Sequence, residues 1–446
     1  MIYAVSAGQY SSNKGDDILR KRHKYLNYGL LGIGSLIKHL YHKDVLVVQG
    51  DYDPVLHVVN KMNSKFLIED TDLILLSIPS YFSLPWCEEF CEVIKNRYGT
   101  RIYAGGRWVV NKDIEWISQR LPLIDKFYDG FGEQHLSDIL FSSPSKEDDS
   151  MNVFGFLDYS LLIDYQDYQP CIEISRGCGM GCSFCLDGKT LRTKNKSVIK
   201  VKKEIMRLQA LYGNPNIYFE SPHFIFEKDW SDELINSLAG NHINWRCTSR
   251  VDTIPIQYIE KLFDSGLSII DVGLESASLS QLLKMRKTRC PEKYLLRANE
   301  LLKECNRVGV RIKLNILLYP GETRETLKET TDWLMNHSQY INGVSTSSMI
   351  YYRNAGSLND LISQGAAVKD DENLERNGYV FLDVGRDIKH DDTKKIGLAF
   401  SQQIVTKEDY YSLKSFSYFS PSYTYSMFQE DIGKMSEKDL PFKVIS

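Results

Sequence analysis

Short apolar runs alternate with amphipathic stretches through the first 141 residues. Residues 2–6, 45–49, 73–78 and 101–104 are apolar or rich in β-formers, and helix-like stretches near 26–40, 54–62 and 85–97 separate them. Strand–helix alternation predicts a doubly wound parallel sheet, and the unbroken apolar run at 73–76 fits a strand buried on both faces. We therefore expect a Rossmann-like α/β domain over residues 1–145.

The alternation resumes further along the chain. Candidate strands lie at 171–175, 216–220, 243–248, 268–274, 311–318 and 344–350. A helix is expected between the first two, because Val201, Ile205 and Leu208 recur at helical spacing and Gly213 follows as a stop signal. Six strand–helix units predict a parallel partial (β/α)6 barrel over residues 165–350, and an open parallel sheet fits the same pattern.

Two segments break the pattern. Residues 142–152 are rich in serine and acidic residues, which indicates a boundary between domains. We expect the linker itself at residues 146–164. Residues 351–446 have poor periodicity and many tyrosines and phenylalanines, eight of them between 410 and 428. We expect this C-terminal extension to cap the barrel and contact substrate, with a plain aromatic core as the alternative.

Composition narrows the class of protein. The 446 residues are 43% hydrophobic and 25% charged, as in an ordinary globular chain. The net charge of -4 excludes a global basic field for nucleic acid or membrane binding. The basic run at 189–203 has no interleaved aromatic residues, so we interpret it as a solvated surface. We see neither a membrane span nor a signal peptide and expect a cytoplasmic protein.

Three of the nine cysteines fall within eight residues. Cys178, Cys182 and Cys185 follow a predicted strand directly, and glycines at 177, 179 and 181 let the loop wrap closely around a ligand. Thiolates suit iron–sulfur clusters and zinc. Since no further Cys or His follows nearby, the set leaves one metal position open for an exogenous ligand. The alternative is that the three cysteines are ordinary buried residues that bind no metal.

The Cys-x3-Cys-x2-Cys spacing, with Phe184 before the third cysteine, resembles the radical S-adenosylmethionine (SAM) superfamily. The resemblance implies that Cys178, Cys182 and Cys185 hold a [4Fe–4S] cluster. It also implies that SAM binds the fourth iron and is cleaved reductively to a 5′-deoxyadenosyl radical. An electron donor such as flavodoxin or ferredoxin would supply the electron.

Companion motifs follow in the order of that family. They are 219–221 after the second strand, 248–250 after the third, Gly-x-Glu-Ser at 273–276, and Pro-Gly-Glu-Thr at 320–323. The alternative interpretation is turns and helix caps. The resemblance implies that a set of residues around the cluster binds SAM: Phe184, Glu220, Ser249, Arg250 and Glu275.

The first 145 residues resemble the cobalamin-binding type of domain, through the Gly-Leu pattern at 28–34 and the Gly-Glu turn at 129–133. The resemblance implies cobalamin contacts at Ser77, Gly105 and Gly106, which end two strands. The Asp-x-His-x-x-Gly motif for a cobalt ligand is missing. A degenerate domain that serves as scaffold is therefore the alternative.

Together these features predict a radical SAM enzyme that modifies an unactivated carbon of a small-molecule or peptide substrate. Cobalamin-dependent methyl transfer is the favoured subtype. The runner-up is cobalamin-free epimerisation or ring formation on a peptide or natural-product precursor. A non-enzymatic iron–sulfur or zinc module is a third hypothesis. No further catalytic residue is assigned.

Overall fold

A computed structural model describes residues 1–10, 18–144, 155–353, 355–370 and 372–444. The chain divides into two compact units. The first comprises Met1–Tyr168 with the short segments Tyr352–Asn354 and Asn373–Tyr379. The second comprises Gln169–Tyr351, Ala355–Glu372 and Val380–Ser446.

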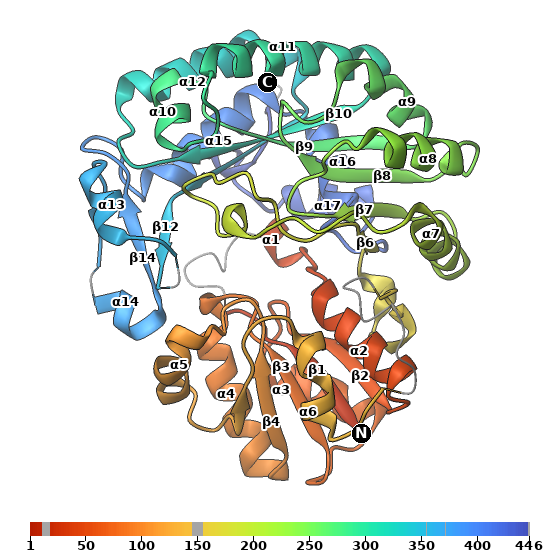
Figure 1. Cartoon of the computed structure of the whole chain (residues 1–446). Coiled ribbons are helices and arrows are strands. Elements are labelled where there is room, and N and C mark those ends of the chain that lie inside the picture. Colours follow the sequence, from red (N-terminus) through yellow and green to blue (C-terminus); the bar gives the residue numbers. More distant parts are fainter. Residues whose placement is uncertain (11–17, 145–154, 354, 371, 445–446) are drawn as a thin grey trace. The chain divides into compact units, whose positions relative to one another are not determined.

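The N-terminal unit is built on a five-stranded parallel sheet with the order β2-β1-β3-β4-β5 (Figure 1). All five residues of β1 are buried, as expected for a strand covered on both faces. Its strands are β1 (Ile2–Ser6), β2 (Val45–Gln49), β3 (Leu73–Ser77), β4 (Arg101–Gly105) and β5 (Lys126–Phe127). Its helices are α1 (Ile18–Lys21), α2 (Tyr28–Leu40), α3 (Val55–Lys65), α4 (Leu84–Tyr98), α5 (Ile114–Arg120) and α6 (Leu136–Leu140).

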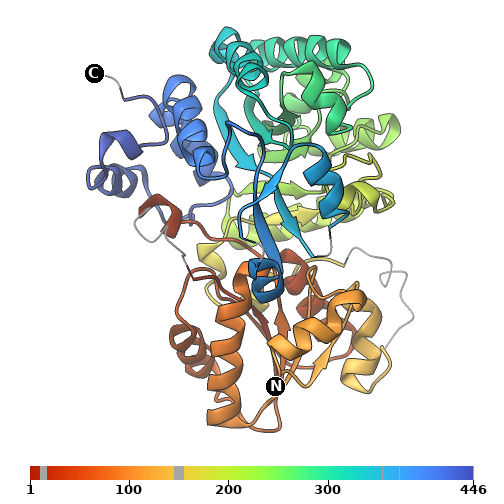
Figure 2. The ribbon, with the colours of Figure 1, turned by 90° about the vertical axis from the view of Figure 1, so that its left-hand side faces the viewer.

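The second unit contains a six-stranded parallel sheet whose strands lie in sequence order, β11-β10-β9-β8-β7-β6. Figure 2 shows the intervening helices together on one side of this sheet. The strands are β6 (Cys171–Glu173), β7 (Asn216–Glu220), β8 (Asn244–Ser249), β9 (Leu267–Glu275), β10 (Arg311–Leu318) and β11 (Gly343–Ser348). The helices are α7 (Val198–Tyr212), α8 (Lys228–Leu238), α9 (Ile259–Asp264), α10 (Leu279–Lys284), α11 (Pro291–Val308) and α12 (Arg324–Asn336).

The register of this sheet separates an apolar face from a polar one. Phe219, Trp245 and Ile312 are fully buried on the helix-covered side. On the opposite side lie polar residues at neighbouring positions of the strands: Glu173 pairs with Glu220, and Asp271 pairs with both Thr248 and Lys313. A filled barrel interior would carry branched apolar residues at these positions. The sequence of this sheet therefore specifies a polar interior.

The C-terminal extension contributes more regular structure than the sequence predicts. A small three-stranded sheet, ordered β12-β14-β13, lies within it. Its elements are β12 (Ile350–Tyr352), α13 (Leu358–Ser363), β13 (Ala367–Val368), α14 (Glu372–Asn377), β14 (Tyr379–Asp383), α15 (Asp392–Ile404), α16 (Lys407–Ser415) and α17 (Tyr425–Ile432). Periodicity missed these elements because most are only two to nine residues long.

Aromatic packing and polar contacts fix the last helices. Phe419 and Phe428 are fully buried, and both pack against Tyr411. From α16, Leu413 O accepts a hydrogen bond of 2.8 Å from Arg246 on the polar side of the six-stranded sheet. The extension therefore contains an aromatic core and covers part of the barrel interior. Substrate contact by this region stays a prediction.

The expected fold class is confirmed: a Rossmann-like parallel sheet precedes a parallel partial barrel. Residues 146–154 of the predicted linker at 146–164 lie outside the described residues. The remaining part, 155–164, is described and belongs to the N-terminal unit, where Ile163 N donates a hydrogen bond of 2.9 Å to Val47 O. Among the helices that are described, none combines the length and apolar character needed to cross a membrane.

Candidate active site

The cysteine loop begins where β6 ends and is held by the segment that follows it. Cys178 N donates a hydrogen bond of 3.1 Å to Thr190 O. Gly177 has a φ of 68°, and a Cβ on it would lie 2.2 Å from Leu191 O. Any other residue would push this segment away. The glycine beside the first cysteine is therefore required by close packing of the loop.

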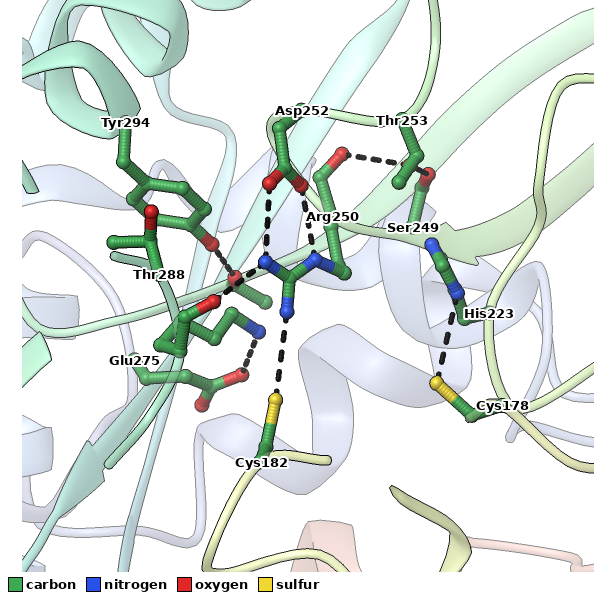
Figure 3. Close-up of polar contacts among 12 residues, drawn as sticks. Cys178, Cys182, His223, Ser249, Arg250, Asp252, Thr253, Glu275, Thr288 and Tyr294 are labelled. Atoms are coloured by element: carbon green, nitrogen blue, oxygen red, sulfur yellow. Dashed lines mark hydrogen bonds and ion pairs between the residues drawn. The ribbon is translucent and has the colours of Figure 1, made fainter. Parts of the chain in front are cut away.

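Nitrogen atoms from the ends of two neighbouring strands reach two of the three thiols (Figure 3). His223 Nδ1 lies 3.6 Å from Cys178 Sγ, and Arg250 Nη1 donates to Cys182 Sγ at 3.4 Å. Burial lowers the pKa of His223 to about 4, and the charges of Arg250 and Lys287 act in the same direction. The imidazole is therefore neutral. Its Nε2 is buried and has no hydrogen-bond partner among the described residues.

In the described part of the chain, no three His, Cys, Asp or Glu side chains converge on a point that one metal ion could occupy. The three cysteines of a [4Fe–4S] cluster bind three different irons, so they need not converge in this way. Thiols at 178, 182 and 185 on one tight loop, with nitrogen donors at two sulfurs, match the donor set of such a cluster.

Arg250 connects the cysteine loop to two further elements. Its guanidinium forms a two-pronged ion pair with Asp252 at 2.9 and 3.0 Å and donates to Lys287 O at 2.6 Å. It also lies 5.7 Å from the ring centre of Tyr294. Burial disfavours the charged form, but the hydrogen bond to Asp252 and the nearby Tyr294 outweigh it and raise the pKa of Arg250 above its usual range. The site therefore holds a fixed positive charge beside Cys182.

Glu275 ends β9 in a backbone conformation that only some residues tolerate, with a φ of 69°. Its Oε1 accepts a hydrogen bond of 3.0 Å from Lys287 Nζ, which also lies 5.8 Å from the ring centre of Phe184. A Cβ on Gly273 would lie 2.5 Å from that same carboxylate oxygen. The Gly-x-Glu pattern thus makes room for the Glu275–Lys287 pair.

The structure brings together Phe184, Arg250 and Glu275 of the residues predicted to bind SAM, with Lys287 joining all three. Ser249 lies next to Arg250 but is engaged elsewhere. Its hydroxyl donates to Phe224 O at 3.1 Å and lies 2.9 Å from Thr253 Oγ1. Ser249 therefore holds the loop after β7 in place.

Glu220 is one of the polar residues of the barrel interior. Burial raises the pKa of this half-buried carboxyl group to about 8, and the charges of Asp271 and Glu173 act in the same direction. Asp271 is the opposite case. Burial alone would raise the pKa of Asp271. The positive charges of Arg246, at 2.6 and 2.7 Å, and of Lys313, at 3.1 Å, outweigh that effect and hold the pKa well below the usual range. The interior therefore combines an ionised carboxylate with one that retains its proton near neutral pH.

The carboxyl edge of the N-terminal sheet has a different character. Asn27 Nδ2 donates to Ser6 Oγ at 3.1 Å and to Ser77 Oγ at 3.0 Å, while Asn27 N donates to Gln49 Oε1 at 3.1 Å. The buried Gln49 Nε2 has no hydrogen-bond partner among the described residues. Ser77 is therefore tied into a local network that leaves one donor unused.

The predicted glycines at the end of β4 have local explanations. A Cβ on Gly105 would lie 3.3 Å from Tyr128 O. Gly106 has a φ of 112°, and its Cβ would lie 3.0 Å from Ile78 O. Tight packing of the chain onto itself accounts for both glycines, and a cobalamin role for them stays a proposal.

Sequence reasoning missed three residues of the site: His223, Lys287 and Tyr294. His223 was visible as the next histidine after the cysteines, but nothing in its spacing places it beside Cys178. Lys287 lies between two helices, and its role depends on the approach of that loop to Glu275. Tyr294 lies on α11, where its hydroxyl donates to Gly273 O at 2.7 Å. In the sequence it has the pattern of an ordinary core residue of that helix.

Comparisons with known proteins agree with this geometry. Residues 172–334 match the family described as "Radical SAM superfamily". A curated relative, "Uncharacterized methyltransferase PH0819" from Pyrococcus horikoshii, is 27% identical over 164 residues. That match covers 36% of this chain and 35% of the relative. The chain thus matches about a third of that relative's length.

Solved structures extend the likeness beyond the matched domain. The cobalamin-dependent S-adenosylmethionine radical enzyme OxsB aligns with a TM-score of 0.56 at 17% identity, over 77% of this chain and 52% of OxsB. The radical S-adenosylmethionine methyltransferase TsrM from Kitasatospora setae, with cobalamin and a [4Fe–4S] cluster bound, aligns with a TM-score of 0.59 at 14% identity. That alignment covers 78% of this chain and 72% of TsrM.

At these identities the alignments establish a shared fold. Their span exceeds the stretch from Gln169 to the end of the chain, so the likeness includes part of the N-terminal unit. The cysteine loop, the six strands in sequence order and the family match at 172–334 together identify this chain as one that carries a radical SAM superfamily domain.

Proposed function

We propose that this protein uses SAM and a [4Fe–4S] cluster to modify an unactivated carbon of an organic substrate. The main supporting observation is that nitrogen atoms contact two thiols of the glycine-rich loop. Arg250 Nη1 lies 3.4 Å from Cys182 Sγ, and His223 Nδ1 lies 3.6 Å from Cys178 Sγ. A bound cluster would supply the electron that cleaves SAM to a 5′-deoxyadenosyl radical.

The residues around the loop have separate tasks in this proposal. Cys178, Cys182 and Cys185 hold the cluster. Arg250 and Lys287 supply positive charge for the SAM carboxylate, and Glu275 supplies a carboxylate for its cationic groups. Phe184 contributes an aromatic surface beside Lys287.

We further propose cobalamin-dependent methyl transfer as the subtype. Its support is the fold shared with OxsB and TsrM, together with the unused donor of Gln49 at the edge of the N-terminal sheet. Ser77, Gly105 and Gly106 lie at the same edge. Bound cobalamin would carry the methyl group.

A cobalamin-free reaction on a peptide or natural-product precursor is the second candidate. The observation in its favour is that Asn27 already binds Ser6 and Ser77, and that local packing explains Gly105 and Gly106. In this case the N-terminal unit would serve as a scaffold.

One experiment tests the proposal and separates the two candidates. Protein purified without oxygen from cobalamin-fed cells is analysed for iron and cobalt and assayed for 5′-deoxyadenosine after chemical reduction. We expect about four irons per chain, with cobalt only for the first candidate. Cys182→Ala should abolish iron binding and SAM cleavage, whereas Cys290→Ala, at an exposed cysteine, should leave both intact. SAM cleavage by Cys182→Ala would refute the proposal.

A further inference from the structure

The surface beside the cysteine loop carries charge of the opposite sign to the rest of the protein. Between 188 and 203 the sequence has seven basic residues and no acidic one, although the whole chain has a net charge of -4. Two of the seven are neutralised internally, because Arg192 pairs with Glu227 and the buried Lys196 pairs with Glu204. Lys203 is followed directly by Glu204, but that carboxylate is buried and pairs with Lys196.

Four of these lysines are exposed and form no ion pair among the described residues: Lys194, Lys200, Lys202 and Lys203. Lys194 lies on the segment that hydrogen-bonds to the cysteine loop, and the other three lie on α7. This helix follows β6, which is the edge strand of the six-stranded sheet (Figure 1). The positive charge therefore lies along the outer side of the barrel.

Exposed apolar side chains share this surface. Leu191 is 87% exposed, although its carbonyl packs against Gly177 beside the first cysteine. Ile199 and Met206 on α7 are 63% and 61% exposed. Met180, between the first two cysteines, is also exposed. Apolar groups that are surrounded by charges of one sign are typical of a site where another macromolecule docks.

We propose that this basic surface, made by Leu191, Lys194 and the exposed side of α7, docks an acidic one-electron carrier of the flavodoxin or ferredoxin kind. The inference rests on the proposed function, since it needs a cluster on the cysteine loop. The carrier loses one electron and the cluster gains it. A carrier docked on this surface would lie close to the cluster, because Leu191 and Met180 lie next to the cysteines.

An acidic protein fits this surface better than a nucleic acid does. Single-stranded nucleic acids bind where aromatic side chains stack with bases among the basic residues. The stretch from 188 to 203 contains no Phe, Tyr or Trp. Its exposed apolar residues are aliphatic, which suits the apolar centre of a protein interface with a charged rim.

Charge reversal tests this surface with the intact, cluster-loaded enzyme. The variant is Lys200→Glu/Lys203→Glu, and the matched control is Lys394→Glu/Lys395→Glu, at exposed lysines on α15. Stopped-flow absorbance measures the rate at which a reduced, acidic flavodoxin reduces the cluster. At low salt we expect a loss of about tenfold or more for the α7 variant and little change for the control. The difference should shrink at high salt.

Two further measurements make each outcome decisive. Dithionite-driven SAM cleavage should be unchanged in the α7 variant, which shows that its cluster and active site are intact. If the wild-type enzyme binds no iron or cleaves no SAM with dithionite, the proposed function fails. If the enzyme is active but both variants accept electrons from flavodoxin at the wild-type rate, only the docking proposal is overturned. Binding of a labelled RNA oligonucleotide that the α7 variant loses, with flavodoxin reduction unchanged, would also overturn it.

Discussion

The two parallel sheets of this protein end in contrasting ways at their carboxyl edges. In the N-terminal sheet, polar side chains at the strand ends bind one another, with Asn27 joining Ser6 and Ser77. In the six-stranded sheet, the strand ends direct nitrogen atoms at cysteine sulfurs. Arg250 follows β8, and His223 follows β7.

The difference does not lie in how many buried polar groups lack a protein partner. A buried polar group without a partner costs free energy, and a bound ligand can offset that cost. Both edges keep such groups among the described residues: Gln49 Nε2, Tyr81 Oη and Ser83 Oγ at the N-terminal edge, and Ser221 Oγ and His223 Nε2 after β7. What sets the second edge apart is that its nitrogen atoms face cysteine sulfurs, the ligands that an iron–sulfur cluster needs.

The largest expected effect concerns Arg250. Replacing it by Met removes the charge beside Cys182 and the bonds to Asp252 and Lys287 O, so SAM binding should weaken by roughly 10–100-fold. Calorimetric titration of SAM into the anaerobic, iron-loaded protein measures this. The exposed Arg307→Met on α11 is the control. Unchanged SAM affinity in Arg250→Met would show that this edge is not the SAM site.

A smaller effect concerns Glu220 and pH. Because its pKa is raised to about 8 in the folded state, the folded protein keeps a proton that the unfolded chain releases above its usual pKa of 4.5. The free energy of unfolding should therefore fall as pH rises from about 4.5 to 8. Glu220→Gln cannot ionise, so at pH 9 it should be more stable than wild type by roughly 2 kcal/mol, with allowance for partial exposure.

Urea unfolding at several pH values checks this expectation. The two proteins should have similar stability near pH 4.5 and diverge above it. Glu233→Gln, at an exposed position on α8, should follow the wild-type curve throughout. Parallel curves for Glu220→Gln and wild type would show that the carboxyl group of Glu220 ionises normally in the folded protein.

The smallest effect concerns the N-terminal edge. Asn27→Ala removes the cap of α2 and the bonds to Ser6 and Ser77, and should lower the free energy of unfolding by about 1–2 kcal/mol. Asn27→Asp keeps the cap acceptor but loses the two donated bonds, so its loss should be smaller. Iron content should be unchanged in both. A loss of iron in Asn27→Ala would mean that the two edges do not act independently.

The sequence by itself determined the elements whose signals are local. Alternating apolar residues such as those in 311–318 became the expected strands, because a strand that buries one face needs an apolar residue at every second position. The cysteine loop could also be recognised in the sequence, since its three cysteines and its glycines lie within a dozen residues. Arg250 and Glu275 were predicted because each lies in a short motif, at the end of a strand, that resembles one of the radical SAM superfamily.

Only the tertiary structure decided which of these residues meet. Lys287 joins Phe184, Arg250 and Glu275 although up to 103 positions separate them in sequence, and His223 reaches Cys178 across 45. It also assigned Ser249 to holding a loop and Glu220 to the barrel interior. Contacts of this kind depend on strand register and loop approach, which no pattern along the chain encodes. The physical reason is that periodicity reports what each element buries, whereas chemistry depends on where the ends of separate elements come together.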